Sequence, residues 1–258
     1  MTSSWRNIRA IAGKELRSYY SSPVAWVLLG LFGTLFGTFF AAGLLGFLQA
    51  SMSQFGGPQR PVNVNNDLIS PVLHNAAVII LFIVPMITMR SYAEEKRSGT
   101  IELLLTSPLK DVEIVIGKFL AGMGMYVGLL GVSALFMSVL FLTGNPAWKP
   151  VLSGYLGLLL LGGGFVALGL VLSSLTNNQM VAGASSFVLF LVLWVTGWFV
   201  DSVGPRTGEV LSYLSIIEHF GDFAKGIIDT KHIVYYLSVI AFGLFLTTKS
   251  VDTERWRG

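Results

Sequence analysis

Residues 150–200 contain no Asp, Glu, Lys, Arg or His, and this uncharged stretch limits the possible folds more than any other feature of the sequence. Because a membrane-spanning helix needs about 20 predominantly apolar residues, the stretch is too long for one span and suits two, separated by the polar segment 173–179. Residues 119–148 also lack charged side chains and predict another span. Only 12% of the whole chain is charged, against roughly 25% in soluble domains. The sequence therefore predicts an all-α integral membrane protein.

Six transmembrane helices are predicted within a single domain that covers residues 1–258. Residues 1–22 precede them as an interfacial amphipathic helix, because apolar side chains recur every three or four positions from Trp5 to Tyr19. The first apolar run is about twice as long as that of a signal peptide, so we interpret it as the first span. The predicted spans are residues 24–48, 72–90, 112–143, 151–173, 180–200 and 233–249.

The basic side chains predict the orientation of these spans. They concentrate before the first span, in the segment 90–118 and after the last span from Lys249 onward. Cytoplasmic loops carry an excess of Lys and Arg, so both termini and the loop 91–111 are expected in the cytoplasm. The net charge of +3 and the pI near 9.2 would also suit a nucleic-acid-binding protein. Because the basic residues flank apolar runs, they indicate orientation in a membrane, and no nucleic-acid partner is expected.

The loop 91–111, between the second and third spans, contains an apolar patch. Ser98, Gly99 and Thr100 offer N-cap chemistry for a short helix, and Pro108 suits the first turn of the next one. The aliphatic side chains of the short helix are Ile101, Leu103, Leu104 and Leu105. Since a solvated loop is normally polar, the patch indicates a helix that docks on a partner. The alternative is a solvated connector between two spans.

Residues 201–232 are amphipathic and contain no window of about 20 apolar residues, so they cannot cross the membrane as a simple helix. Thr207 precedes one short helical pattern, and the residues from Ser215 to Glu218 have the sequence of a capping box for a second helix. That helix carries an apolar stripe at Ile216, Phe220, Phe223 and Ile227. We therefore expect an external re-entrant helical hairpin between the fifth and sixth spans, on or in the outer face of the membrane.

The sequence lacks the motifs of several catalytic sites. Of the phosphate-binding motif GxxxxGK[ST], the sequence contains only the Gly-Lys pair at 117–118. The chain itself is therefore not expected to hydrolyse ATP. It has no cysteine and no HExxH motif, and neither a metal nor a bound cofactor is predicted. The segment 183–186 resembles the surroundings of a serine protease nucleophile, with Ser185 as nucleophile and His74 or His219 as base. Small residues in a span usually serve helix packing, so an intramembrane enzyme is kept only as an alternative.

Two motifs in the loop resemble a known family. Residues 94–108 (EEKRSGTIELLLTSP), followed by residues 113–118 (EIVIGK), closely resemble the ABC-2 type ABC exporter permeases, which have the type V fold. The resemblance extends in order over the whole chain, from the amphipathic N-terminal helix through six spans and the external hairpin. Residues 214–229 (LSIIEHFGDFAKGIID) further resemble the branch typified by gliding-motility permeases (GldF-like).

The resemblance implies several partners. Two permease protomers, as a homodimer or heterodimer, would pair with two separate ABC ATPase subunits that bind ATP and Mg, and an accessory periplasmic or membrane subunit is compatible with this assembly. The loop helix would be a cytoplasmic coupling helix that docks on the ATPase. The implied ATPase-coupling residues are Glu94, Glu95, Arg97, Gly99, Thr100, Ile101, Glu102, Leu103, Leu104 and Pro108. Those of the external hairpin are Ser215, Glu218, His219, Phe220 and Phe223.

On this basis the chain is expected to be the permease subunit of an exporter in a bacterial inner membrane, multi-pass with cytoplasmic termini. Its uncharged spans suit a lipid-like or amphipathic substrate, and they suit plain helix packing equally well. A non-catalytic membrane assembly or anchor subunit is an alternative, and its function would not depend on ATP turnover.

Overall fold

The computed structural model describes residues 2–53, 63–144 and 146–255, and over these residues the protein contains helices and no strands. Six helices are long and apolar enough to cross a membrane, which confirms the expected all-α architecture with six candidate spans. These spans are built on α2 (Pro23–Ser53), α3 (Ser70–Thr88), α6 (Asp111–Thr143), α7 (Trp148–Ser174), α8 (Gln179–Val195) and α11 (Thr230–Arg255).

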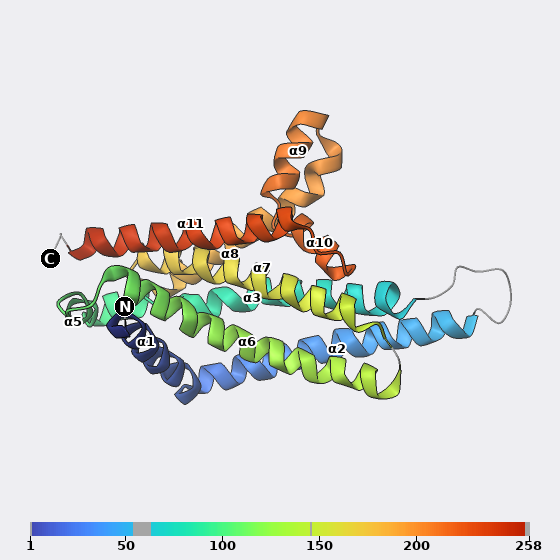
Figure 1. The fold of residues 1–258 in the computed structure, drawn as a ribbon, viewed down its shortest axis with the longest axis horizontal. Helices are drawn as coiled ribbons and strands as arrows, with labels where there is room; N and C mark the ends of the chain where they lie inside the picture. Colours follow the sequence, from blue (N-terminus) through green and yellow to red (C-terminus); the bar gives the residue numbers. More distant parts are fainter. Residues whose placement is uncertain (1, 54–62, 145, 256–258) are drawn as a thin grey trace.

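The remaining helices lie around these spans. They are α1 (Thr2–Ser21), the π-helical turn η2 (Val64–Ile69), α4 (Ala93–Ser98), α5 (Ile101–Leu105), the 3-10 helix η3 (Thr196–Ser202), α9 (Pro205–Leu214) and α10 (Glu218–Ala224). Both ends of the chain lie at the same end of the bundle as α5, which we call the basal end (Figure 1). The opposite end is called the distal end. Figure 1 also shows that α9 stands out sideways from the bundle, whereas α10 lies against the side of the bundle.

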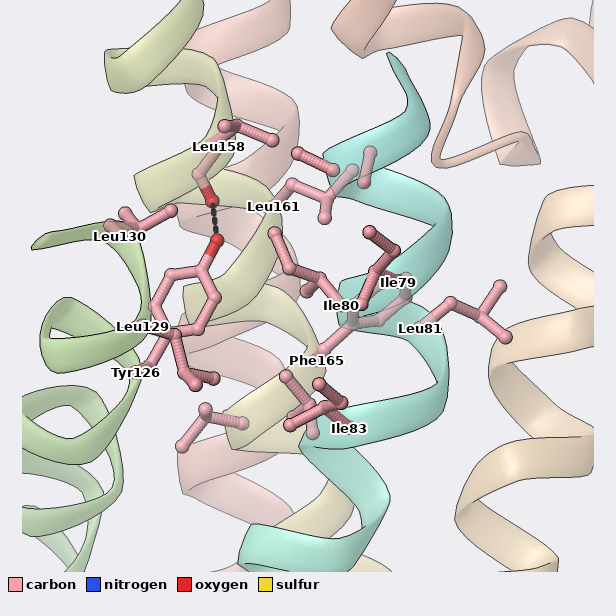
Figure 2. Close-up of a cluster of buried hydrophobic side chains, with 14 of the residues drawn as sticks. Ile79, Ile80, Leu81, Ile83, Tyr126, Leu129, Leu130, Leu158, Leu161 and Phe165 are labelled. Carbon is pink, nitrogen blue, oxygen red and sulfur yellow. Dashed lines mark hydrogen bonds between the residues drawn. The ribbon is translucent and has the colours of Figure 1, made fainter. Parts of the chain in front are cut away.

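The core lies between α3, α6 and α7. Figure 2 shows Ile80 and Ile83 of α3 close to Leu161 and Phe165 of α7, and all four side chains are almost completely buried. On the other side of α7, the hydroxyl of Tyr126 in α6 donates a hydrogen bond of 2.6 Å to the carbonyl oxygen of Leu158 (Figure 2). Because α7 also contacts α8, α10 and α11, it is the central helix of the bundle.

The glycines of α7 explain this central position. Gly162 touches the ring of Tyr126 so closely that a methyl group at this position would overlap it. Gly157 leaves room for Phe223 of α10 in the same way, and Gly163 faces α11. In lipid, helices associate through close packing at small residues rather than through the hydrophobic effect. The glycine-rich sequence therefore lets three neighbouring helices approach α7 at once.

The apolar face of α1 packs mainly against α6. Gly117 of α6 lies against Ile11, and Gly124 lies against Leu16, so that α1 runs alongside the first half of α6. Trp5, at the start of the same face, is 62% exposed. Sequence reasoning assigned this face to the membrane interface. In the structure, most of this face packs against α6, because glycines on α6 allow a second helix to approach. The interfacial position of α1 stays a prediction.

The helical pair α9 and α10 is present, but the predicted capping box is wrong. α10 begins only at Glu218, and no side chain among the described residues caps its first N–H groups. The hydroxyl of Ser215 is buried and finds no hydrogen-bond partner within the same residues. The turn before α10 is held instead by Tyr236 of α11, whose hydroxyl donates a 2.7 Å hydrogen bond to the carbonyl oxygen of Ile216. A tertiary contact has therefore replaced the local capping interaction.

Candidate functional site

The segment between α3 and α6 forms two short helices where the sequence predicted one. α4 ends at Ser98 and is followed by Gly99, whose φ of 71° lies in the left-handed region that glycine adopts without strain. The predicted N-cap is wrong, because Thr100 has a helical backbone and its side chain caps no N–H group of α5. Pro108 does not open the next helix either. α6 begins at Asp111, where the carboxylate of Glu113 accepts a hydrogen bond from the N–H of the residue before the helix.

Lys118 of α6 joins three elements at the basal end. Its side chain is 2% exposed, and Nζ lies 2.8 Å from Oε1 of Glu95 and 3.3 Å from Oε1 of Glu15. The ammonium group also donates to the carbonyl oxygen of Ser91 at 2.7 Å and lies 5.0 Å from the centre of the Tyr92 ring. A buried charge is tolerated only when it is paired and hydrogen-bonded. Lys118 therefore ties α4, α1 and the end of α3 to α6.

The last turn of α11 holds the segment 93–111 from another side. Glu254 forms an ion pair with Lys96 of α4. Arg255 lies 2.8 Å from Oδ1 of Asp111, and it donates a 3.1 Å hydrogen bond to the carbonyl oxygen of Leu109. The final span of the chain thus contacts both the beginning and the end of the segment that contains α5.

Ser173 of α7 fixes the point at which α4 begins. Its Oγ accepts hydrogen bonds from the backbone N–H groups of Tyr92 at 3.1 Å and Ala93 at 3.2 Å. The same hydroxyl donates to the carbonyl oxygen of Met89 at 3.1 Å. The first N–H groups of a helix lack partners within the helix. A side chain of the central helix provides these partners, so α4 is anchored to α7 as well as to α6 and α11.

The predicted coupling residues divide into an outward and an inward group. Leu103 is 75% exposed, whereas Ile101 is buried and Leu104 packs against the core. The side chain of Leu105 lies outside the described residues. Glu95 also belongs to the inward group, because it pairs with Lys118. The exposed members are Glu94, Arg97, Gly99, Thr100, Glu102, Leu103 and Pro108.

A cavity of about 440 Å³ lies beside α4, between α1, α2 and α3. Tyr19 contributes to its wall, and its hydroxyl donates to the carbonyl oxygen of Ile87 at 3.3 Å. Burial raises the pKa of Tyr19 to about 12, so this side chain stays neutral. Arg90 and Glu94 also line the cavity. Because side chains of both signs are present, the lining does not select an anionic or a cationic ligand.

Four of the five predicted hairpin residues are buried. Phe220 and Phe223 pack against Gly157 of α7 and attach the hairpin to the centre of the bundle. Ser215 is buried in the turn that precedes α10, and His219 is buried in the first turn of the helix itself. Glu218 is exposed. Within the part of the chain that the structure describes, no group of three or more His, Cys, Asp or Glu side chains could hold a metal ion.

The residues considered for an intramembrane enzyme lie apart. Ser185 lies two positions after Gly183, which packs against Met89, the residue that follows α3. His74 is fifteen positions earlier in the chain than Met89, which corresponds to about 22 Å along a helix. His219 lies in α10 and contacts a second histidine. Among the described residues, Ser185 therefore has no hydrogen bond to a histidine, and the structure does not support this alternative.

Sequence reasoning missed the residues that hold the coupling segment in place. These are Lys118, Ser173, Glu254 and Arg255, together with Glu15, Lys96 and Asp111, whereas Glu95 was among the predicted coupling residues. One signal was available for Lys118, since it is the last charged side chain before a long apolar run. A charge that enters a span is expensive unless it is paired, so it predicts a partner. Ser173 is one of several small polar residues near the end of its helix, and nothing in the sequence distinguishes it.

Comparison with known proteins identifies the family. The family described as "ABC-2 family transporter protein" matches residues 9–247. Two similar proteins, both named "Probable multidrug ABC transporter permease YbhR", come from Escherichia coli strain K12 and Escherichia coli O157:H7. Each is 29% identical over 158 residues, and the match covers 58% of this chain but only 41% of the relative. Because the family match extends over most of the chain, this protein belongs to the ABC-2 family of transporter permeases.

Proposed function

We propose that the chain is the permease subunit of an ABC exporter and that α5 is the helix on which a separate ATPase acts. The observation that carries this proposal is the position of Leu103, which is 75% exposed on a helix whose neighbours Ile101 and Leu104 face inward. An exposed leucine surrounded by charged residues such as Glu102 suits the centre of a docking surface, with an apolar core and a polar rim. ATP and Mg would bind to the ATPase and not to this chain.

The contacts of α4 suggest how a force on α5 would reach the spans. α4 is tied to α1 and α6 through Lys118, to α11 through Lys96 and to α7 through Ser173. Breaking a buried ion pair leaves an unpaired charge, which is costly, so such contacts resist separation. When a closing ATPase dimer displaced α5, the spans α6, α7 and α11 would therefore move with it.

We further propose an assembly of two permease protomers, identical or related, with two ATPase subunits in a bacterial inner membrane. A single six-span unit has few helices to enclose a path, which supports pairing. Both termini would be cytoplasmic, and an accessory external subunit could complete the assembly. The uncharged spans, and the word "multidrug" in the name of the relatives, support a lipid-like or amphipathic substrate. Residues 214–229 support the gliding-motility (GldF-like) branch.

Affinity purification in mild detergent tests the proposed partners. We expect the chain to be recovered as a permease dimer together with an ATPase subunit that carries the phosphate-binding loop this chain lacks. The alternative of an assembly or anchor subunit predicts a function that does not depend on ATP turnover. Recovery of a monomer without any ATPase, combined with an unchanged function after ATP depletion, would contradict the exporter proposal.

The proposed orientation can be measured by cysteine labelling, because the chain contains no cysteine. Thr207 in α9, Ser98 in α4 and Thr253 in α11 are all exposed. We expect Thr207→Cys to react with a membrane-impermeant thiol reagent in intact cells, since α9 would be external. Ser98→Cys and Thr253→Cys should react only after permeabilisation. External labelling of Ser98→Cys would show that the orientation is reversed.

A further inference from the structure

Two buried histidines face each other where α10 meets the start of α11. Nδ1 of His219 lies 2.9 Å from Nδ1 of His232, and both side chains are at least nine-tenths buried. The other ring nitrogens are also engaged. Nε2 of His219 lies 3.1 Å from the carbonyl oxygen of Tyr213 in α9, and Nε2 of His232 lies 2.9 Å from Oδ2 of Asp222 in α10. These contacts form one continuous line through α9, α10 and α11.

The number of protons on the two histidine rings determines how stable this line of contacts is. A carbonyl oxygen and an ionised carboxylate can only accept hydrogen bonds, so Nε2 of each ring must donate. A neutral imidazole has one N–H, and both rings would then have used theirs. The two Nδ1 atoms would face each other as lone pairs at 2.9 Å. One additional proton between them removes this repulsion and forms an N–H···N hydrogen bond of ordinary length.

We infer that His219 and His232 form a site for a single proton, and that this proton fastens the external hairpin to the first turn of α11. The proton comes from water, and no covalent bond other than N–H forms or breaks. On the other side of the pair, Nε2 of His232 lies 2.9 Å from the carboxylate of Asp222. This inference concerns the hairpin and does not depend on the proposed exporter function.

A second proton is resisted. Burial of the ring, together with the neighbouring His232, lowers the pKa of His219 to about 4. The titratable and charged groups around the pair are Glu209 and Tyr213 of α9, Glu218 and Asp222 of α10, Asp229 before α11, and Lys231, Tyr235 and Tyr236 of α11. Carboxylates, lysines and tyrosines ordinarily titrate outside the range of roughly pH 5 to 9. A pH dependence between these limits is therefore expected from the two rings and not from their neighbours.

The pair predicts an optimum in the dependence of stability on pH. Free histidine has a pKa of 6.5, so two separated rings together hold about one proton at that pH. At higher pH the separated rings hold less than one proton while the folded pair still holds one, so stability falls as the pH rises. At lower pH the separated rings approach two protons while the folded pair holds only one, so stability falls as the pH decreases. Stability is therefore greatest near pH 6.5.

Thermal unfolding of the full chain in lipid nanodiscs between roughly pH 5 and 9 tests this site. The parent protein should show a maximum of Tm near pH 6.5. His219→Asn should keep only the decrease toward high pH, and His232→Asn should keep only the decrease toward low pH. His74→Asn is the matched control. His74 is the remaining histidine of the three in the sequence, and its ring is hydrogen-bonded to the carbonyl oxygen of Ser70 in its own helix. This variant should retain the parent profile, and a parent profile without a maximum would overturn the inference.

Nitrogen NMR of the parent protein with labelled histidine provides a second measurement that does not depend on the variants. Near pH 6.5 we expect one charged and one neutral ring, joined by a coupling across the Nδ1–Nδ1 hydrogen bond. Two neutral rings, or two charged rings, would contradict the inference. The unfolding measurement is repeated with EDTA and with Zn²⁺. If Zn²⁺ stabilises the protein, EDTA removes this effect and both histidines are required for it, then a metal ion and not a proton joins the two rings. That result would overturn the proposal.

Discussion

Replacement of Lys118 by methionine is expected to destabilise the protein by about 3 to 5 kcal/mol, because it leaves the largely buried carboxylate of Glu95 without its partner. Methionine keeps most of the length of the side chain, so the loss is mainly electrostatic. Glu95 would lose the ammonium group at 2.8 Å, and its other oxygen is already buried without a hydrogen-bond partner in the described part of the chain. Glu15 retains Lys14 at 4.0 Å, so it would be affected less. The free energy of unfolding in detergent measures the effect.

Two further variants separate the buried ion pair from a general effect of charge. Lys249→Met removes an exposed lysine that pairs with Asp252 at 3.6 Å, and we expect it to cost less than about 1 kcal/mol. The double variant Lys118→Met/Glu95→Gln removes both charges of the buried pair, so it should recover a large part of the loss. If Lys118→Met costs no more than Lys249→Met, then Lys118 does not hold α4 in place.

Leu103→Ser is expected to weaken binding of the ATPase by about ten- to a hundredfold. Burying a leucine contributes about 1.5 to 3 kcal/mol, and each 1.4 kcal/mol corresponds to a factor of ten in affinity. Because Leu103 is 75% exposed, the substitution should change the stability of the permease by no more than about 0.5 kcal/mol. Leu104→Ser provides the contrast, since Leu104 packs against the core and its loss should destabilise the permease itself.

The six spans could be predicted because their signal is local and strong. The uncharged run 150–200 is divided where the sequence predicted, with α7 ending at Ser174 and α8 starting at Gln179. Asn178 caps α8 through its side-chain oxygen, which accepts hydrogen bonds from two backbone N–H groups. Hydropathy over about 20 residues and one capping residue are sufficient for such a boundary.

The arrangement around α5 could not be predicted because its partners are far apart in the sequence. Lys118 and Glu15 are separated by 103 positions, and Lys96 and Glu254 by 158. Sequence periodicity gives no information about contacts between residues so far apart in the chain. The local capping signals at Thr100 and Ser215 failed for two different reasons. Gly99 allows α5 to follow α4 directly, so that Thr100 keeps a helical backbone. The turn before α10 is held by a contact from Tyr236 of α11, which is distant in the sequence.

The proposal that α5 couples the permease to a separate ATPase is tested most directly by one comparison in the same membranes. ATPase co-purification and permease-stimulated ATP turnover are measured for the parent, for Leu103→Ser and for Leu175→Ser. Leu175 is a matched control, because it is 66% exposed and directly follows the basal end of α7. We predict that Leu103→Ser loses both ATPase binding and stimulated turnover, whereas Leu175→Ser retains both. Unchanged binding and turnover in Leu103→Ser would contradict the account, and the loop would then be only a connector between two spans.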